Sequence, residues 1–361
     1  MTLRDDFLAR FDGSAGPHPL YVPDLTLWYQ WHHSRGTLPA EWQNYTLVQI
    51  ARALGVPAWV VVRPWRMETA GVSITTEEAD GARTLTYQTA SGVLTARWTL
   101  GPDGDWWQTE YPVKSGADLA AARELIAARA YTLDAAELVA AHAAVGEDGV
   151  VAIELPMRPY SEVLHALIGW SEGLMLLMGE EGPAILELAT LLEARLQELV
   201  AEIAALPGVL VLAPDNLDGQ FISPGVFREH LAASYEQTAA TLHAHGKRLI
   251  VHVGGPVSRL LPLLAAAGVD GVEGVSGPPQ GDATLAAARA LAGPQITLWG
   301  GIPQDFLLAA RSQAEFEDAC ASALMEARGD PRAIVGVADR VPVGADRARL
   351  QYLAEVTRRR P

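Results

Sequence analysis

Cysteine is almost absent from this 361-residue chain, which contains Cys320 and no other. A single cysteine excludes an intrachain disulfide and any metal site built from several thiolates. Cys320 lies on the apolar side of a helical run, residues 316–327. We expect it to be a buried structural thiol, because free cysteines are among the most buried residue types.

Positive charge is also scarce, since 27 Lys and Arg face 43 Asp and Glu, a formal net charge of −16. An acidic surface repels phosphate backbones, so we expect no nucleic-acid partner. No apolar run reaches the roughly 20 residues that a membrane span needs, so no membrane association is expected. Residues 1–13 carry acids where a secretory signal has a basic stretch and an apolar core, which favours a cytoplasmic protein.

What the chain does contain is a series of short apolar runs, each followed by a turn and a helical stretch. The runs cover residues 19–23, 58–62, 150–155, 209–213, 248–253, 269–275, 295–299 and 333–338. Such runs are typical of buried parallel strands. Helical segments lie between them, for example 184–206 and 226–246. Eight repeats of strand and helix predict an α/β fold, a (β/α)8 TIM barrel, as a single domain over residues 1–361.

One region breaks this alternation. Residues 82–114 alternate apolar and polar side chains and carry turn signals at 90–92 and 102–104. This pattern predicts an antiparallel β-hairpin or three-stranded meander inserted after the second strand. No GxGxxG follows an early strand and no P-loop sequence occurs, which argues against a nucleotide-binding fold.

Polar residues recur where the apolar runs end, and TIM barrels hold their active sites at that edge. His252 is the strongest candidate, because the glycines at 254 and 255 would let a ligand approach the backbone. A histidine there can be a general acid or base, a metal ligand or a donor to a carboxylate; the alternative is a core histidine bonded to a neighbouring strand. We assign catalytic roles to His252, Asp215 and Glu154. The substrate-binding candidates are Asn216, Arg63, Arg66, Arg158, Tyr160, Glu273, Trp299 and Asp339.

Several of these residues have a structural alternative. Asp215 and Asn216 can hold a substrate or a water, or they can cap the loop that follows them. Glu154 needs a partner if it is buried, and Arg158 is near in sequence. Glu273 lies in a glycine-rich stretch where it can be solvated. Asp24 and Arg340 also follow strands, and no role is assigned to them.

Residues 222–275 and 297–308 resemble the uroporphyrinogen decarboxylase superfamily, which includes the decarboxylases and the methyltransferases that serve corrinoid proteins. The resemblance rests on a Ser-Pro helix start at 223–224, a strand that ends in His252 before glycines, and a later Gly-Gly-Ile-Pro segment at 300–303. It implies a (β/α)8 barrel, a small-molecule substrate and a homodimer. A corrinoid protein is a further partner that it suggests.

Departures from the family pattern limit which mechanism can be transferred. The decarboxylases have an arginine-rich motif after the first strand and an acidic residue after the second. Here those regions read VPDLTLWYQWHH and RPWRM. The methyltransferase branch holds zinc with a His-x-Cys pair and a later cysteine, whereas this chain has His252-Val253-Gly254 and no cysteine near 336–338. We therefore expect no metal and no cofactor, with an atypical site on His252 and carboxylates left open.

These observations support three hypotheses about function. The first is an enzyme of the methyltransferase-like branch, acting on a small organic or tetrapyrrole-type substrate without Cys-ligated zinc. The second is a cofactor-free, porphyrinogen-type decarboxylase, which is a lyase. The third is a barrel that has lost catalysis and binds a corrinoid, a tetrapyrrole or a partner protein.

Overall fold

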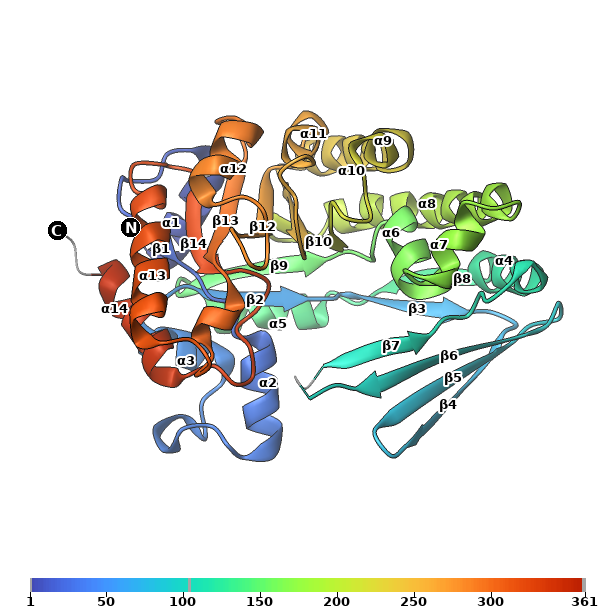
Figure 1. The fold of residues 1–361 in the computed structure, drawn as a ribbon, viewed down its shortest axis with the longest axis horizontal. Coiled ribbons are helices and arrows are strands. Elements are labelled where there is room, and N and C mark those ends of the chain that lie inside the picture. Colours follow the sequence, from blue (N-terminus) through green and yellow to red (C-terminus); the bar gives the residue numbers. More distant parts are fainter. Residues whose placement is uncertain (1, 103–104, 359–361) are drawn as a thin grey trace. The chain divides into compact units, whose positions relative to one another are not determined.

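The computed structural model describes residues 2–102 and 105–358, and Asp103 and Gly104 of the second predicted turn lie outside them (Figure 1). Contacts divide the chain into two compact units. The first comprises Met1–Arg63, Ala136–Leu155 and Leu206–Pro361; the second comprises Pro64–Ala135 and Pro156–Ala205. The prediction of a single domain is not tested by this division. No helix among the described residues is long and apolar enough to cross a membrane.

The first unit is built on a parallel sheet with the strand order β1-β14-β13-β12-β11-β10-β9-β2. Its strands are β1 (Leu20–Tyr21), β2 (Ala58–Val62), β9 (Gly149–Glu154), β10 (Leu210–Leu217), β11 (Arg248–Val253), β12 (Gly271–Val275), β13 (Thr297–Ile302) and β14 (Ala333–Val337). Each predicted apolar run forms one of them. This confirms the α/β class and the parallel sheet of eight strands.

Side chains from the two end strands of the sheet meet in one core, which shows that the sheet is curled. Leu20 of β1 and Trp59 of β2 belong to the same buried cluster, together with Trp299 of β13. The Trp59 and Trp299 rings lie edge to face with centroids 4.8 Å apart. Large aromatic rings fill the interior of the curled sheet, as expected of a TIM-like barrel, which is packed rather than open.

Helices of the first unit are α1 (Leu3–Asp12), α2 (Thr26–Arg35), α3 (Leu47–Leu54), α5 (Ala136–Val145), α9 (Pro224–Val226), α10 (Ala232–His243), α11 (Leu261–Ala266), α12 (Leu285–Ala292), α13 (Gln313–Ala327) and α14 (Arg347–Arg358). The segment Phe227–Leu231 between α9 and α10 is a π-helix. Ser223 caps α9 through its side chain, as the Ser-Pro signal predicts. Cys320 on α13 is buried, and burial raises the pKa of its thiol to about 12, which confirms the expected structural cysteine.

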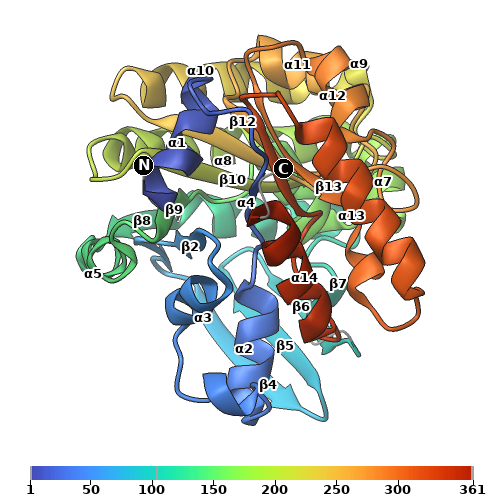
Figure 2. The same ribbon diagram turned by 90° about the vertical axis from the view of Figure 1, so that its left-hand side faces the viewer.

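Helix α1 closes the end of the sheet where the strands begin, a feature that the sequence did not reveal. Phe7 is fully buried, and its ring lies 5.4 Å from that of Trp299. The hydroxyl of Thr297, at the start of β13, donates to the Arg10 carbonyl at 2.9 Å. In Figures 1 and 2, α1 (dark blue) lies at the tails of the strand arrows. Helix α1 therefore blocks entry to the interior of the curled sheet from the end where the strands begin.

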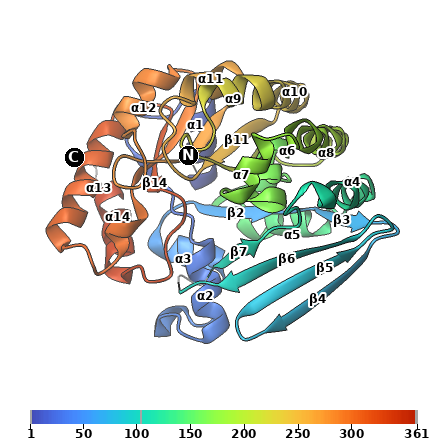
Figure 3. The same cartoon turned by 45° about the vertical axis from the view of Figure 1, so that its right-hand side comes forward.

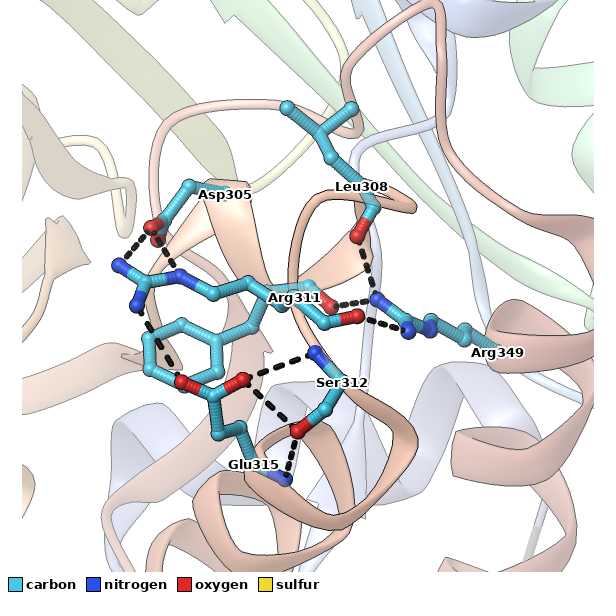
Figure 4. Close-up of polar contacts among 7 residues, drawn as sticks. Asp305, Leu308, Arg311, Ser312, Glu315 and Arg349 are labelled. Carbon is cyan, nitrogen blue, oxygen red and sulfur yellow. Dashed lines mark hydrogen bonds and ion pairs between the residues drawn. The ribbon is translucent and has the colours of Figure 1, made fainter.

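The loop after β13 is held by arginines. Arg349 of α14 donates to the carbonyl oxygens of Phe306, Leu308 and Arg311 at 2.6–2.7 Å (Figure 4). Arg311 in turn contacts Asp305, and Glu315 caps the start of α13 through Ser312. This network fixes the segment that follows Gly-Gly-Ile-Pro.

The second unit contains two antiparallel sheets (Figure 3). One pairs β3 (Trp65–Thr69) with β8 (Arg129–Leu133); the other is the meander β4 (Ser73–Ala79), β5 (Ala82–Gln88), β6 (Val93–Leu100) and β7 (Trp106–Glu110). Its helices are α4 (Leu119–Ala127), α6 (Pro159–Glu162), α7 (Glu172–Leu177) and α8 (Gly182–Ala204), with a π-helix at Val163–Ile168. The sequence predicts an antiparallel meander of at most three strands over residues 82–114, whereas the observed sheet has four strands and begins earlier, at Ser73. Strand β4 is exposed along its whole length, so it lacks the apolar alternation that marks a strand in sequence.

Candidate functional site

His252 and Glu273 form a close pair at the carboxyl ends of β11 and β12. The two residues are direct register partners in the parallel ladder. The Nδ1 atom of His252 lies 2.5 Å from Oε2 of Glu273. Side chains of register partners point to the same face of the sheet, so the pairing of β11 with β12 brings these two side chains together. Glu273 holds one ring nitrogen and leaves the other, Nε2, for a different partner.

Asp339 faces that second nitrogen. Its Oδ1 atom lies 3.7 Å from Nε2 of His252 and 3.4 Å from Nε of Arg340. Asp24, just after β1, adds a third carboxylate, and its charge acts on Glu273. The Asp24 carboxylate accepts from the backbone N–H of Thr26 at 2.8 Å. We call His252, Glu273, Asp339, Asp24 and Arg340 the His252 cluster.

The electrostatics of the cluster favour a protonated His252. Burial by itself lowers the pKa of the imidazole, but the charge and hydrogen bond of Glu273, with the charge of Asp339, outweigh burial and raise that pKa to about 9. Burial also raises the pKa of Glu273 above its usual range, against the opposing effect of His252. Desolvation likewise raises the pKa of Asp24. The raised pKa of His252 favours the imidazolium form of this ring beside Glu273 and Asp339.

The backbone around Asp339 is set in place from several sides. Asp339 has a φ of 66°, a left-handed conformation that is uncommon outside glycine and is found at functional sites. The preceding residue, Ala338, donates its N–H to Ile302 at 2.7 Å and accepts from the Gln280 side chain at 3.4 Å. The Gln280 side chain also accepts from the N–H of Gln304 at 2.9 Å. The loops after β12, β13 and β14 therefore support the carboxylate that faces His252.

The glycine after β11 makes room for Asn216. A Cβ atom at Gly254 would lie 1.7 Å from Oδ1 of Asn216. Asn216 itself is exposed and has a φ of 48°. The predicted role for this glycine was close approach of a ligand, and in the structure the group that approaches is the Asn216 side chain.

Glu154, at the end of β9, forms an ion pair with Arg63, which follows β2. Glu154 is mostly buried, whereas 59% of the Arg63 side chain is exposed. Both strands belong to the first unit and are neighbours in its sheet. The pair supplies a cation and a carboxylate at the same edge as the His252 cluster.

Asp215 and Trp299 lie elsewhere in the first unit. Asp215 has no exposed surface and accepts a hydrogen bond from the Tyr235 hydroxyl of α10. A substrate cannot reach this carboxylate in the described conformation, so its position favours a structural role over the catalytic one we predicted. Trp299 is 2% exposed and donates its indole N–H to the Val22 carbonyl at 3.0 Å. It packs the core beneath the strand ends.

The remaining predicted substrate-binding residues belong to the second unit. Arg66 is exposed on β3. Arg158 and Tyr160 are buried at the start of α6. In that unit the guanidinium of Arg129 pairs with Glu162, and burial raises the pKa of the neighbouring Tyr131 to about 12. Substrate binding by Arg66, Arg158 and Tyr160 stays a prediction.

For two members of the cluster, Asp24 and Arg340, the sequence predicts a position after a strand and no functional role. Asp24 precedes a helix start, so its sequence position is equally typical of a cap. Arg340 is adjacent to Asp339 in the sequence, which indicates an ion pair between the two residues and nothing more. Whether Asp24 and Arg340 reach the His252 cluster depends on the course of the loops after β1 and β14. The sequence pattern does not specify that course.

The residues present do not fit the thiolate zinc site of the methyltransferase branch. Gly254 stands where the first thiolate would be, and Cys320, the single cysteine, is buried on α13. Within residues 2–102 and 105–358, no group of three or more His, Cys, Asp or Glu is arranged to hold a metal ion. No catalytic step is therefore derived through zinc.

Comparisons with known proteins give one family match over part of the chain and one similar fold over nearly all of it. Residues 183–360 match the family model "Uroporphyrinogen decarboxylase (URO-D)". A methyltransferase from Methanosarcina mazei has a similar structure, with a TM-score of 0.59 at 12% identity, covering 99% of this chain and 98% of that one. At this identity the likeness shows the fold alone. No curated protein matches the sequence.

Two epimerase structures are more distant. A D-psicose 3-epimerase in the presence of D-fructose has a TM-score of 0.36 at 11% identity, over 66% of this chain and 84% of that one. A D-psicose 3-epimerase with D-tagatose from Clostridium cellulolyticum H10 has a TM-score of 0.33 at 13% identity, over 59% and 77%. These low scores carry no argument about function.

Proposed function

We propose that this chain, a divergent member of the uroporphyrinogen decarboxylase superfamily, is an enzyme of the methyltransferase-like branch that uses His252 as a proton donor in place of Cys-ligated zinc. The observation that supports this most is the 2.5 Å contact between His252 and Glu273. It keeps the imidazole protonated and oriented. The substrate class is a small organic or tetrapyrrole-type molecule.

A proton donor has a definite task in methyl transfer from a heteroatom. When the bond between the methyl carbon and the heteroatom breaks, its electron pair stays on the heteroatom, which becomes a better leaving group if it is protonated. The Nε2–H of His252 can supply that proton, since 18% of the side chain is exposed. The methyl group passes to an external nucleophile, for which we propose a corrinoid protein.

Each remaining member of the cluster has a role in this scheme. Glu273 orients the ring and stabilises its positive charge, in the way that a carboxylate supports a catalytic histidine in other enzymes. Oδ1 of Asp339 lies 3.7 Å from Nε2 of His252, which is too far for a hydrogen bond. A substrate heteroatom could come closer to Nε2 than Asp339 does and accept a hydrogen bond from it. Arg63 and Arg340 offer positive charge for an anionic substituent.

Decarboxylation of a porphyrinogen-type substrate is the second candidate. Loss of CO2 also needs a proton for the carbon that remains, and His252 could provide it. The carboxylates Asp24 and Asp339 next to it could accept hydrogen bonds from pyrrole N–H groups. Against this, the region after β1 has no arginine before Arg35 to bind carboxylates.

Two parallel assays separate these functions. The protein is incubated with cob(I)alamin and a panel of methoxylated, methylamino and methylthio compounds, and methylcobalamin formation is followed by absorbance. Separately, it is incubated with uroporphyrinogen and the products are separated by chromatography. We expect methylcobalamin with at least one methyl donor and no decarboxylated porphyrinogen.

The variant His252→Gln tests the proposed proton donor. It should lower turnover by about 100-fold or more, the usual contribution of a positioned general acid. His245→Gln is the matched control, because His245 is an exposed histidine of the same unit whose Nδ1 contacts the Thr241 carbonyl. Full activity in His252→Gln would overturn the mechanism, and turnover of uroporphyrinogen would establish the second candidate instead.

A further inference from the structure

A cavity of about 350 Å³ lies at the opposite end of the first unit from the His252 cluster. Its lining includes the last residue of α1, Asp12, and the first residue of β11, Arg248. Asp270 and Arg332 precede β12 and β14, and His243 ends α10. The cavity is therefore built where strands begin, a face of TIM barrels that does not hold the active site.

Most charges in this cavity are matched in pairs. Arg248 contacts Asp12 at 3.0 Å, and Nε2 of His243 lies 2.7 Å from Asp270. Arg332 has no carboxylate within salt-bridge distance in the described part of the chain. Its guanidinium donates through Nη1 to the Phe11 carbonyl. In the described part of the chain, neither Nε nor Nη2 of Arg332 makes a hydrogen bond, and a Cβ atom at Gly13 would lie 2.9 Å from Nε.

The surroundings of Arg332 make its charge unfavourable in the absence of an anion. Burial lowers the pKa of its guanidinium, and the positive charges of Arg289 and Arg248 lower it further. Arg289 cannot serve as the anion site, since it is bonded to Asp330 and to the carbonyl oxygens of Gly293 and Ile296. Asp12 and Asp270 act in the opposite direction on Arg332, but both already pair with Arg248, at 3.0 Å and 3.8 Å.

We propose that this cavity binds a small phosphate-type anion, either inorganic phosphate or a phosphate monoester, through Arg332, with Arg248 adding positive charge beside it. A guanidinium presents two parallel N–H donors that match two oxygens of a phosphate group. Ala265 and Val269 also line the cavity, so a monoester can place a short organic group against them. The ligand would connect the end of α1 to the starts of β11 and β14. This site is independent of the function proposed for the His252 cluster.

Calorimetric titration of the full-length protein tests the site, with sodium phosphate and glycerol 3-phosphate as probes and chloride at matched ionic strength as the reference. We expect saturable binding of one phosphate per chain and tighter binding of the monoester. Arg332→Gln should weaken both by about tenfold or more, because a charge-assisted pair is lost. Arg52→Gln should bind as the parent does, since Arg52 pairs with Asp148 on an exposed part of the same unit.

Two further variants keep the test decisive. Arg248→Gln removes the second positive charge and should weaken phosphate binding as well. If circular dichroism shows that Arg332→Gln does not fold, Arg248→Gln serves as the test of the site. His252→Gln should leave phosphate affinity unchanged, which distinguishes this cavity from the opposite end of the unit. Absence of saturable binding, or parent-like affinity in folded Arg332→Gln, would overturn the proposal.

Discussion

Replacing Glu273 by glutamine should lower the pKa of His252 from about 9 toward its ordinary value of 6.5. Glutamine keeps the size of the side chain and an oxygen that can face Nδ1, but it has no negative charge. Burial then acts on the imidazole with only Asp339 opposing it. The perturbation therefore isolates the charge of one carboxylate.

The magnitude follows from the difference between the two pKa values. At about 1.36 kcal/mol per pKa unit, a histidine pKa of about 9 in the folded protein corresponds to about 3 kcal/mol of stabilisation of the charged form. Because the folded-state pKa is raised, this stabilisation is fully present below pH 6.5 and is lost as the pH rises through about 9. In Glu273→Gln most of that pH dependence should disappear.

Two measurements check this expectation. NMR titration of the histidine Hε1 resonances, with His252 assigned from the spectrum of His252→Gln, gives the pKa directly. Urea denaturation at pH 6 and pH 9 gives the free energy of unfolding and its change with pH. Glu41→Gln is the control, since Glu41 pairs with Arg347 at an exposed position. The reasoning is refuted if His252 of the parent titrates near 6.5, or if its pKa is the same in Glu273→Gln.

Three other substitutions test the packing around the site, each by urea denaturation. Tyr235→Phe should lower the free energy of unfolding by about 1–3 kcal/mol, because buried Asp215 loses a donor; an unchanged value would contradict the structural role of Asp215. Phe7→Ala should lower it by about 3–5 kcal/mol, since it empties the end of the core that α1 closes. Gly254→Ala should displace Asn216 and lower it by about 1–3 kcal/mol; parent-like stability would show that Asn216 can move freely.

The first unit was predictable because its strands are buried on both faces. Continuous apolar runs such as 248–253 stand out from their polar surroundings, and the observed strand β11 (Arg248–Val253) has the same limits. Pairing between neighbours in the sheet then follows from the strand order. For that reason both His252 and Glu273, near the ends of their own apolar runs, are predictable as site residues from the sequence.

The sequence does not predict the direction in which each side chain at a strand end points. Asp215 follows an apolar run just as Glu154 does, yet it is buried against Tyr235, whereas Glu154 pairs with Arg63. Neighbouring residues of a strand face opposite sides, so an error of one residue in register changes the assignment. Helix α1 was missed because its contacts, such as Phe7 with Trp59, join segments far apart in the chain.

The contacts of His252 bear on which chemistry its site can support. A histidine at the end of β11 can belong to the thiolate zinc site of the methyltransferase branch only if cysteines complete the ligand set. Here Gly254 replaces one candidate thiolate, and the neighbouring strand places Glu273 on Nδ1. A carboxylate in that position raises the basicity of the ring and favours the imidazolium over a neutral ligand. The absence of thiolates and the contact of Glu273 with Nδ1 both support the proton-donor role that we propose for His252.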